Sequence, residues 1–373
     1  MHILFYYSSN KRTVSLESII LALQQRGYQV QLLTICQRGD LHEYLEQNGV
    51  ITHTNISGNN GIWHFLAQVC HLILYCRKYQ IDFAFSHLQQ ANIIAVVAQY
   101  FTKAKFFIFR HHFKFIQNIK DENLDVNQNE HIADKLINKL AKTLVVPSQG
   151  VYNGIITYES INKSKLRIVP YTYKFSNYQS VSEKAVQSIK LLYDAHLLIV
   201  MCARLTKFKR HKVAFEVFAT LIKQGFDIKV MVMDEGEEKE VLTQYVYANT
   251  LQDRIVFLGY KKNILDYIAA ADLLVHPSVT EASNSIVKEA AFVSTAVIVC
   301  KGVGDFDSYI TNERNGFTVS IEHTAEELNC IIEKVYSEKE ILSAYARKLR
   351  SVVINKFGEN SESTLAGYEN LMH

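Results

Sequence analysis

Four charged residues in the C-terminal half of this 373-residue chain have the types and spacing to bind one ligand. Arg204 and Lys209 flank a short loop before a predicted helix, and two fixed cations beside a helix N-terminus favour a diphosphate. Glu281 and Glu289 are eight residues apart, and carboxylates accept hydrogen bonds from the hydroxyls of sugars and riboses. Taken singly, each could be a solvated charge or a salt-bridge partner. Together they predict a site for a nucleotide-sugar.

The two glutamates belong to one predicted β-α-β unit. A strand at Asp272–His276 stops at Pro277, which lacks the N–H that a central strand needs. Three residues of the following loop can each cap the next helix through a side-chain oxygen: Ser283, Asn284 and Ser285. A second strand, Ala296–Cys300, leads to two glycines, where backbone can approach a ligand closely: Gly302 and Gly304. Ligands of such units bind at the carboxyl ends of the strands, which is where these residues fall.

Length and composition indicate a two-domain globular protein, with 48% hydrophobic and 21% charged residues. The six cysteines form no CxxC pair, so we expect a reducing compartment and no zinc site or other metal centre. The N-terminus places apolar residues before basic ones, the reverse of a secretory signal, and no run is long enough to span a membrane. We therefore expect a cytoplasmic protein, or one peripheral on the cytoplasmic face of a membrane.

Charge is unevenly distributed between the two halves. Residues 1–175 hold 18 basic and 11 acidic side chains, a net charge of +7, against −4 for the remainder. Lys103, Lys105 and Lys114 are interleaved with phenylalanines, including Phe106 and Phe107, a mixture that suits a membrane interface or a charged carbohydrate. The alternative is ordinary surface scatter. No nucleic-acid-binding motif accompanies these charges, so we expect no nucleic-acid partner.

The N-terminal half opens with a predicted strand, helix and strand at 2–7, 14–25 and 29–34. The joining loop begins Ser8-Ser9 and has no glycine, so nothing supports a dinucleotide-dependent enzyme. Histidines follow two further predicted strands, where this fold class binds ligands, although any exposed loop can also carry them: His87, His111 and His112.

Two similar segments suggest that both halves share one architecture. Leu144–Ser148 and Leu274–Ser278 are apolar strands that end in Pro-Ser, in a chain with only three prolines. The third, Pro170, marks the predicted end of the first domain. We expect an N-terminal domain at residues 1–175, a C-terminal domain at 176–354, and a terminal helix at about 355–373 that packs back on the first domain.

From about Leu198 to Val319 the sequence resembles the C-terminal domain of retaining glycosyltransferases of family 4. The matching motifs are A-R-L-x-x-x-K (Ala203–Lys209), V-F-L-G (Val256–Gly259), A-A-D-L-L-V-H-P-S (Ala270–Ser278), E-x7-E (Glu281–Glu289) and the loop that begins Lys301-Gly302. The N-terminal half resembles the family more loosely. The resemblance implies an α/β protein of GT-B fold, with two Rossmann-like doubly wound domains facing across a cleft: an acceptor-binding first domain and a nucleotide-sugar-binding second domain.

The resemblance also implies roles for individual residues. Arg204 and Lys209 would hold the donor diphosphate, Glu281 the transferred sugar and Glu289 the ribose, while His111 would line the reaction centre. Further donor contacts would come from the helix start, the V-F-L-G end and the glycine loop: Asn284, Ser285, Ile286, Val287, Gly259, Tyr260, Gly302 and Gly304. The acceptor side would include Ser8, Ser9, His87 and His112.

The implied reaction is metal-independent and uses no cofactor. It moves a hexose-type sugar from a nucleoside-diphosphate donor to a carbohydrate or lipid-linked hydroxyl, in cell-surface polysaccharide or lipopolysaccharide synthesis, with possible contact to the inner membrane face. Departures from the family pattern, such as Glu281-Ala282-Ser283-Asn284 for E-G-F-G, bear on the donor sugar and on acceptor placement. The alternatives are a nucleotide-sugar epimerase of the same fold and a non-catalytic sugar-binding subunit.

Overall fold

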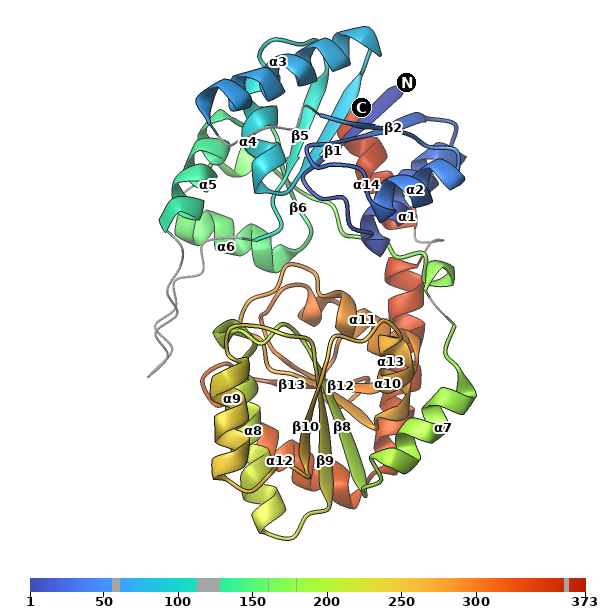
Figure 1. Cartoon of the computed structure of the whole chain (residues 1–373), viewed down its shortest axis with the longest axis vertical. Helices are drawn as coiled ribbons and strands as arrows, with labels where there is room; N and C mark the ends of the chain where they lie inside the picture. The colour runs from blue at the N-terminus through green and yellow to red at the C-terminus, as the bar shows by residue number, and fades with distance from the viewer. Residues whose placement is uncertain (56–60, 113–127, 160, 179, 359–361) are drawn as a thin grey trace. The chain divides into compact units, whose positions relative to one another are not determined.

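The computed structural model describes residues 1–55, 61–112, 128–159, 161–178, 180–358 and 362–373 (Figure 1). These residues form two compact units. Unit 1 contains the described residues up to Asn177 together with those from Phe357 to the C-terminus, and unit 2 spans Tyr178–Lys356. The division at Asn177 lies two residues from the predicted domain boundary. Among the described residues, no helix is long and apolar enough to cross a bilayer.

Unit 1 is built on a seven-stranded parallel sheet with the order β3-β2-β1-β4-β5-β6-β7. Its strands are β1 His2–Tyr7, β2 Gln29–Thr34, β3 Ile51–Thr54, β4 Phe83–His87, β5 Lys105–Phe109, β6 Leu144–Val146 and β7 Leu166–Ile168. Most are continuous apolar runs, because helices cover both faces of a parallel sheet. The helices are α1 Val14–Gln25, α2 Asp40–Gln47, α3 Ile62–Lys78, α4 Gln89–Ala98, α5 Gln128–Leu140, α6 Gln149–Glu159 and α14 Glu362–Met372.

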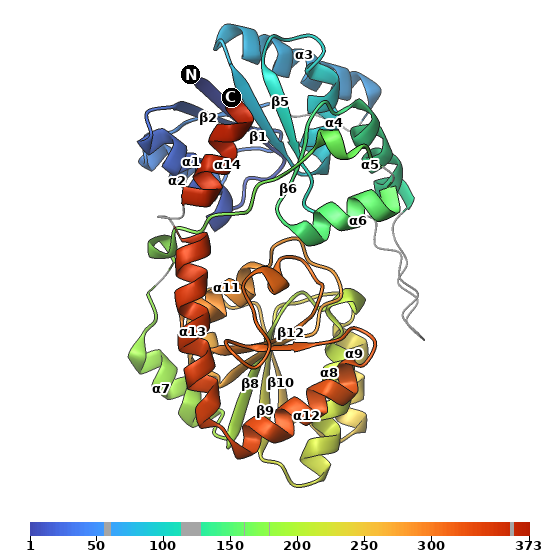
Figure 2. The same cartoon turned by 180° about the vertical axis from the view of Figure 1, so that it is seen from behind.

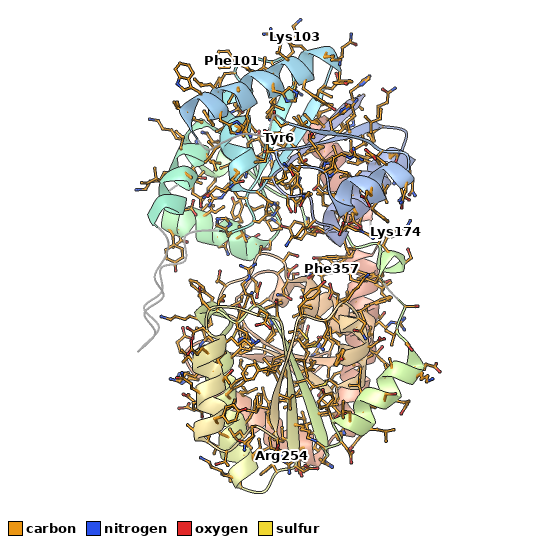
Figure 3. The ribbon with its side chains drawn as sticks, viewed as in Figure 1. Tyr6, Phe101, Lys103, Lys174, Arg254 and Phe357 are labelled. Atoms are coloured by element: carbon orange, nitrogen blue, oxygen red, sulfur yellow. The ribbon has the colours of Figure 1, made fainter. Side chains whose placement is uncertain are left out.

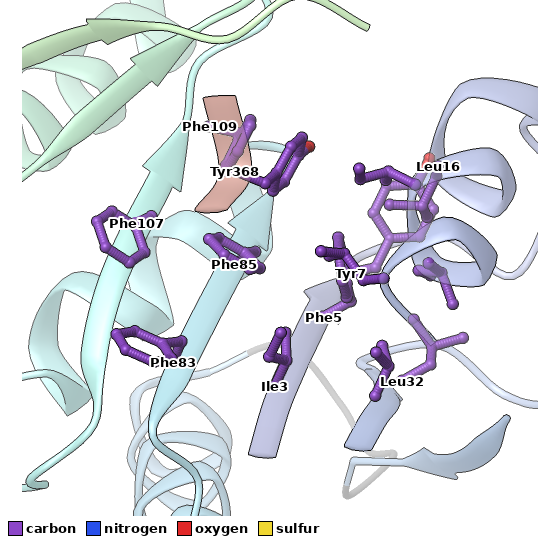
Figure 4. Close-up of a cluster of buried hydrophobic side chains, with 14 of the residues drawn as sticks. Ile3, Phe5, Tyr7, Leu16, Leu32, Phe83, Phe85, Phe107, Phe109 and Tyr368 are labelled. Carbon is purple, nitrogen blue, oxygen red and sulfur yellow. The ribbon is translucent and has the colours of Figure 1, made fainter. Parts of the chain in front are cut away.

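The C-terminal segment contributes to the core of unit 1. Figure 2 shows α14 beside α1, against the sheet. In Figure 4, Tyr368 of α14 lies between the central strands and α1, with its ring 5.1 Å from that of Phe85 and 5.4 Å from that of Phe109. The segment at 355–373 is not one helix, because α13 continues to Phe357 and α14 begins at Glu362.

Two of the phenylalanines that the sequence places at a membrane interface belong instead to this core. Phe106 and Phe107 are 5% and 6% exposed, because both lie inside β5. Lys103 and Lys105 are exposed, as that interpretation requires. Lys114 lies outside the described residues.

Unit 2 is built on a six-stranded parallel sheet with the order β10-β9-β8-β11-β12-β13. Its strands are β8 Leu197–Cys202, β9 Ile228–Met233, β10 Ile255–Gly259, β11 Leu273–His276, β12 Ala296–Cys300 and β13 Phe317–Val319. Its helices are α7 Glu183–Leu192, α8 His211–Lys223, α9 Lys239–Ala248, α10 Ile264–Ala270, α11 Ser285–Phe292, α12 Thr324–Ser337 and α13 Glu340–Phe357, whose last residue belongs to unit 1.

Both sheets have the doubly wound strand order, which confirms the predicted α/β class and the shared architecture of the two halves. In each sheet the order reverses once near the centre, between β1 and β4 in unit 1 and between β8 and β11 in unit 2. Loops diverge at such a reversal and leave a crevice at the carboxyl ends of the strands. Some of the candidate residues of each unit lie at these two points, including Arg204, Glu281, His87 and His111.

Candidate functional site

Arg204 follows β8 at the reversal point of unit 2 and is exposed. Its loop is fixed by the loop that follows β9: Leu205 N donates to Glu235 O at 3.0 Å. Gly236 packs so tightly here that a Cβ atom would lie 2.3 Å from Leu205 O. In the described part of the chain Arg204 forms no ion pair, so a rigid loop presents a guanidinium that is available to an anion.

Lys209 lies at the end of the same loop. It contacts Glu281, which lies in the loop after β11, the other strand of the reversal point. Lys209 Nζ lies 2.5 Å from Glu281 Oε1, and His276 Nε2 lies 2.6 Å from the same oxygen. Burial alone would raise the pKa of Glu281, but the His276 hydrogen bond and the Lys209 charge outweigh it and hold the pKa far below its usual range. Glu281 is therefore a fixed anion at neutral pH.

The neighbouring buried arginine has a structural role. Arg210 donates from Nη1 to Ile321 O at 3.0 Å and to Thr324 Oγ1 at 2.9 Å. Its backbone is left-handed, with φ of 52°, at the turn from the loop into α8. Of the cations in this loop, Lys209 thus contacts Glu281, whereas Arg210 attaches the loop to the start of α12 and the segment before it.

Helix α11 starts at this edge and carries the second glutamate. Of the three predicted caps, Asn284 makes the capping bond, because its Oδ1 accepts from Val287 N at 3.1 Å. The N–H groups of Ser285 and Ile286 have no acceptor within the helix, as in the first turn of any helix. Glu289 is 8% exposed and accepts from Tyr178 Oη at 3.1 Å. Burial raises its pKa to about 6, against the hydrogen bonds from Tyr178 and Ser285.

A buried ion pair attaches the glycine loop to α11. Lys288 is fully buried, and its Nζ lies 2.8 Å from Asp305 Oδ2, 3.0 Å from Ser283 Oγ and 3.1 Å from Asn284 O. Ser283 Oγ also donates to Asp305 Oδ2 at 2.6 Å. Burial lowers the pKa of Lys288, while the Asp305 charge opposes that shift. The pair fixes the loop that contains Gly302 and Gly304 beside the start of the helix.

Gly304 packs directly against Glu281. A Cβ atom at Gly304 would lie 3.0 Å from Glu281 Cβ and 3.2 Å from Glu281 O, and the residue has a φ of +55°. Gly302 is also left-handed, with φ of +78°, but has open space around it. The loop can therefore touch the carboxylate-bearing segment because position 304 has no side chain.

Gly259 and Tyr260 lie farther from this cluster. Gly259 ends β10, which β9 separates from β8, and Tyr260 is 76% exposed. They share the carboxyl edge of the sheet with the charged residues. Their assignment to the donor stays a prediction.

Unit 1 has a cavity of about 160 Å³ at its own reversal point, with His87 and His111 in its lining. The two rings stack with centroids 5.4 Å apart, and His111 Nδ1 is hydrogen-bonded to the Tyr171 hydroxyl. Burial lowers the pKa of His87 and lowers that of His111 to about 3, so both rings are neutral at physiological pH. His87 Nε2 is buried and has no hydrogen-bond partner among the described atoms.

The residues next to His111 hold it in place. Arg110 is 2% exposed and bonds Asp134 at 2.9 Å and Glu159 at 3.1 Å. His112 is directed away from the cavity, with Nε2 3.4 Å from Asp134 Oδ2 and a side chain 54% exposed. The structure thus brings His87 and His111 together and separates His112 from them. Ser8 and Ser9 follow β1 but are not part of the cavity lining.

Two family models together cover most of the chain. The model described as "Glycosyl transferases group 1" matches residues 183–352, and the model described as "Glycosyltransferase Family 4" matches residues 13–171. The chain belongs to glycosyltransferase family 4. The second segment contains all six strands of the sheet in unit 2, and the first contains every strand of the sheet in unit 1 except β1.

Solved structures and curated relatives point the same way. Anabaena HepE, in a crystal structure with UDP-glucose, superimposes with a TM-score of 0.79 over 100% of this chain and 99% of that one, at 19% identity, which shows the GT-B fold. A Campylobacter jejuni diphospho-undecaprenol 4-α-N-acetylgalactosaminyltransferase is 26% identical over 60% of this chain and 58% of its own length. The Staphylococcus aureus capsular polysaccharide glycosyltransferase CapM is 19% identical over 78% of this chain and 77% of its own length. The chain thus aligns with under two thirds of the first of these curated relatives.

Sequence reasoning missed several residues that shape the site of this family 4 glycosyltransferase. His276 holds Glu281, Tyr178 holds Glu289, and Lys288 with Asp305 holds the glycine loop. Lys288 had a visible signal, because it is a charged residue in a helix whose other positions, apart from Ser285 and Glu289, are apolar. Tyr178 had none, since it lies just past the predicted domain boundary and outside every motif.

Proposed function

We propose that this chain transfers a sugar from a nucleoside-diphosphate sugar to an acceptor hydroxyl, with retention of the anomeric configuration and without a metal ion. The observation that carries the proposal is the cluster at the reversal point of unit 2. There the exposed guanidinium of Arg204, an ammonium, an ionised carboxylate and a capped helix start lie on adjacent loops. Phosphate oxygens fit the cations and the helix N–H groups, and sugar hydroxyls fit the carboxylates.

In the proposed reaction, the bond between the anomeric carbon and the diphosphate oxygen breaks, and the electron pair leaves with the diphosphate. Arg204 and Lys209 neutralise the charge that develops there. The acceptor oxygen bonds to the anomeric carbon from the face that the diphosphate leaves, and its proton passes to the departing phosphate oxygen. The Lys209–Glu281 ion pair means that the ammonium must be shared between Glu281 and the phosphate once the donor binds.

We also assign a role to the cavity of unit 1 that His87 and His111 line: its histidines contact the acceptor or the donor sugar. Because His111 is neutral at physiological pH, we assign it hydrogen bonding to a sugar hydroxyl and not proton donation from an imidazolium. The neighbouring His87 lines the same cavity, and its Nε2 has no hydrogen-bond partner in the part of the chain that the structure describes. The relatives named for capsular polysaccharide and undecaprenol-linked sugars support a place in cell-surface polysaccharide or glycolipid synthesis, with a carbohydrate or lipid-linked acceptor.

A binding screen followed by one matched pair of variants tests the proposal. Thermal shifts with UDP-, GDP- and ADP-sugars identify the donor. Arg204→Ala should then lower turnover by about 10²–10³, the usual effect of removing a group aimed at transition-state charge. Lys207→Ala removes an exposed cation from the same loop and should change the rate only slightly. Equal losses of rate in the two variants would refute the assignment of Arg204. If the chain converts the donor alone into an epimerised nucleotide-sugar, the activity is epimerisation and not transfer.

A further inference from the structure

Helix α3 and the strand β3 border a further cavity in unit 1, with a volume of about 430 Å³. Among the described residues, it shares no lining residue with the cavity that contains His87 and His111. β3 lies at one edge of the sheet, and β2 separates it from β1 and the reversal point. Cavities of about 300–1,000 Å³ are typical of small-molecule sites. This cavity thus has the size of a ligand site and lies apart from the proposed reaction centre.

Aromatic rings contribute much of the cavity lining. Tyr75 and Tyr79 have ring centroids 4.4 Å apart, and the ring of His53 lies 5.4 Å from each of them. Side chains that only packed α3 against the edge strand would fill the space between them, because protein interiors contain few voids larger than a water molecule. The space beside these three rings instead leaves apolar surface for a ligand to cover.

Buried hydrogen bonds hold both sides of the cavity in place. Tyr75 Oη donates to Gln31 Oε1 of β2 at 2.6 Å, and both residues are buried. Directly after β3, Asn55 Nδ2 donates to Tyr6 Oη of β1 at 2.9 Å. Figure 3 shows Tyr6 in the interior of unit 1. Because α3 and β3 are each attached to the centre of the sheet, the cavity is preorganised, which lowers the free-energy cost of binding a ligand.

Two imidazoles supply polar atoms to the same cavity. His71 Nδ1 is buried and has no hydrogen-bond partner among the described atoms. Burial lowers the pKa of His71, helped by the charge of His53, and burial with the charge of Lys78 lowers the pKa of His53. Both rings are therefore neutral at physiological pH, and each has one donor and one acceptor nitrogen, which suits a hydroxyl group. The described lining contains Lys78 and no carboxylate or thiolate, which disfavours a metal cation.

We propose that this cavity binds a saccharide, as a second sugar site outside the reaction centre. A pyranose ring has an apolar C–H face, which packs against the rings of Tyr75 and Tyr79. Its hydroxyls donate to and accept from the imidazoles of His53 and His71. The saccharide class follows from the lining and does not rest on sugar transfer. Only the use of the site, the retention of a saccharide acceptor or product, rests on the proposed function.

NMR spectra of the full chain with carbon-13-labelled histidine test where a saccharide binds. Maltotriose, triacetylchitotriose and trigalacturonic acid serve as probes, and His53→Gln and His71→Gln assign the two ring signals. We expect at least one probe to shift both signals with a single dissociation constant. Arg204→Ala should leave these shifts unchanged, so that failure of this site and failure of sugar transfer can be told apart. If no probe shifts the two signals, or if only other histidines respond, the cavity is not a saccharide site.

Substitutions at Tyr79 test the stacking contact. Tyr79 follows the last residue of α3 and is partly exposed, so its truncation leaves the core of unit 1 intact. Tyr79→Ala should raise the dissociation constant about tenfold, whereas Tyr79→Phe keeps the ring and should change it by less than about threefold. The control Tyr247→Ala removes an exposed tyrosine from α9 and should bind as the parent chain does. Equal affinities of the two Tyr79 variants, or an equal loss in the control, would overturn the proposal.

Discussion

Replacing Lys288 by methionine is the most direct test of how the donor-side loops are held. The lysine is fully buried, and its ammonium lies 2.8 Å from Asp305 Oδ2. Methionine has a similar length and no charge, so the substitution removes the cation with little change in packing volume. It leaves a buried carboxylate whose only remaining described hydrogen bond comes from Ser283 Oγ, since Asp305 Oδ1 has no partner among the described atoms.

The size of the loss in stability follows from leaving this carboxylate buried without its counter-charge. Removing one partner of a buried ion pair costs about 3–5 kcal/mol in the free energy of unfolding. For a unit of this size, each kcal/mol lowers the melting temperature by about 2–4 °C, so we expect a decrease of roughly 6–20 °C for unit 2. The loop with Gly302 and Gly304 should also detach from α11, which raises the KM for the donor.

Calorimetry and donor kinetics of three variants test whether the Lys288–Asp305 pair holds the glycine loop. Lys334→Met removes a partly exposed lysine that lies 2.9 Å from Glu313, and should leave the melting temperature nearly unchanged, because water replaces the lost contact. The double variant Lys288→Met/Asp305→Asn removes both buried charges and should recover most of the lost stability. If Lys288→Met is no worse than Lys334→Met, or if the double variant is no better than the single one, the buried pair does not hold the loop.

Two further predictions concern the same site. Gly304→Ala and Gly302→Ala should each lower the free energy of unfolding by about 1–2 kcal/mol, because both residues have a left-handed backbone. Only Gly304→Ala should also lower activity, because a Cβ atom at position 304 would contact Glu281. Equal activities of the two variants would contradict this. The KM for the donor should rise about tenfold between pH 7 and pH 5, because Glu289 has a pKa of about 6 and its protonated form accepts fewer hydrogen bonds. Glu289→Gln should have a pH-independent KM over that range, and a persisting slope would assign the titration elsewhere.

Sequence patterns predicted the elements best where strands are buried on both faces. β1, α1 and β2 begin and end at the predicted residues, because apolar runs there are bounded by polar or glycine residues. The short α2 and β3 went unpredicted, since β3 is a four-residue, partly exposed edge strand with little apolar signal. The phenylalanines of β5 were misplaced at a surface because adjacent lysines suggested exposure.

The sequence predicted the charged residues of the candidate site, which lie in short motifs, but not the contacts that hold them in place. Arg204, Lys209, Glu281 and Glu289 came from local spacing, and the strand order places all four at one edge of one sheet. The supporting contacts join residues distant in sequence, such as Tyr178 with Glu289, and depend on side-chain directions that periodicity does not encode. Similarly, three adjacent positions could cap α11, and only the folded loop selects Asn284.

The two glutamates of the E-x7-E motif show how the fold separates residues that the sequence presents as a pair. Glu281 is held ionised by Lys209 and His276, whereas burial beside Tyr178 pushes Glu289 toward protonation near neutral pH. Two carboxyl groups whose surroundings shift their pKa values in opposite directions can have different functions at one pH. In the proposed reaction, Glu281 supplies a constant negative charge next to the transferred sugar, and Glu289 supplies a titratable acceptor for the ribose. The pH dependence near pH 6 should therefore appear in donor affinity, while turnover at saturating donor stays nearly flat, because Glu289 is assigned to the ribose and not to the reacting centre.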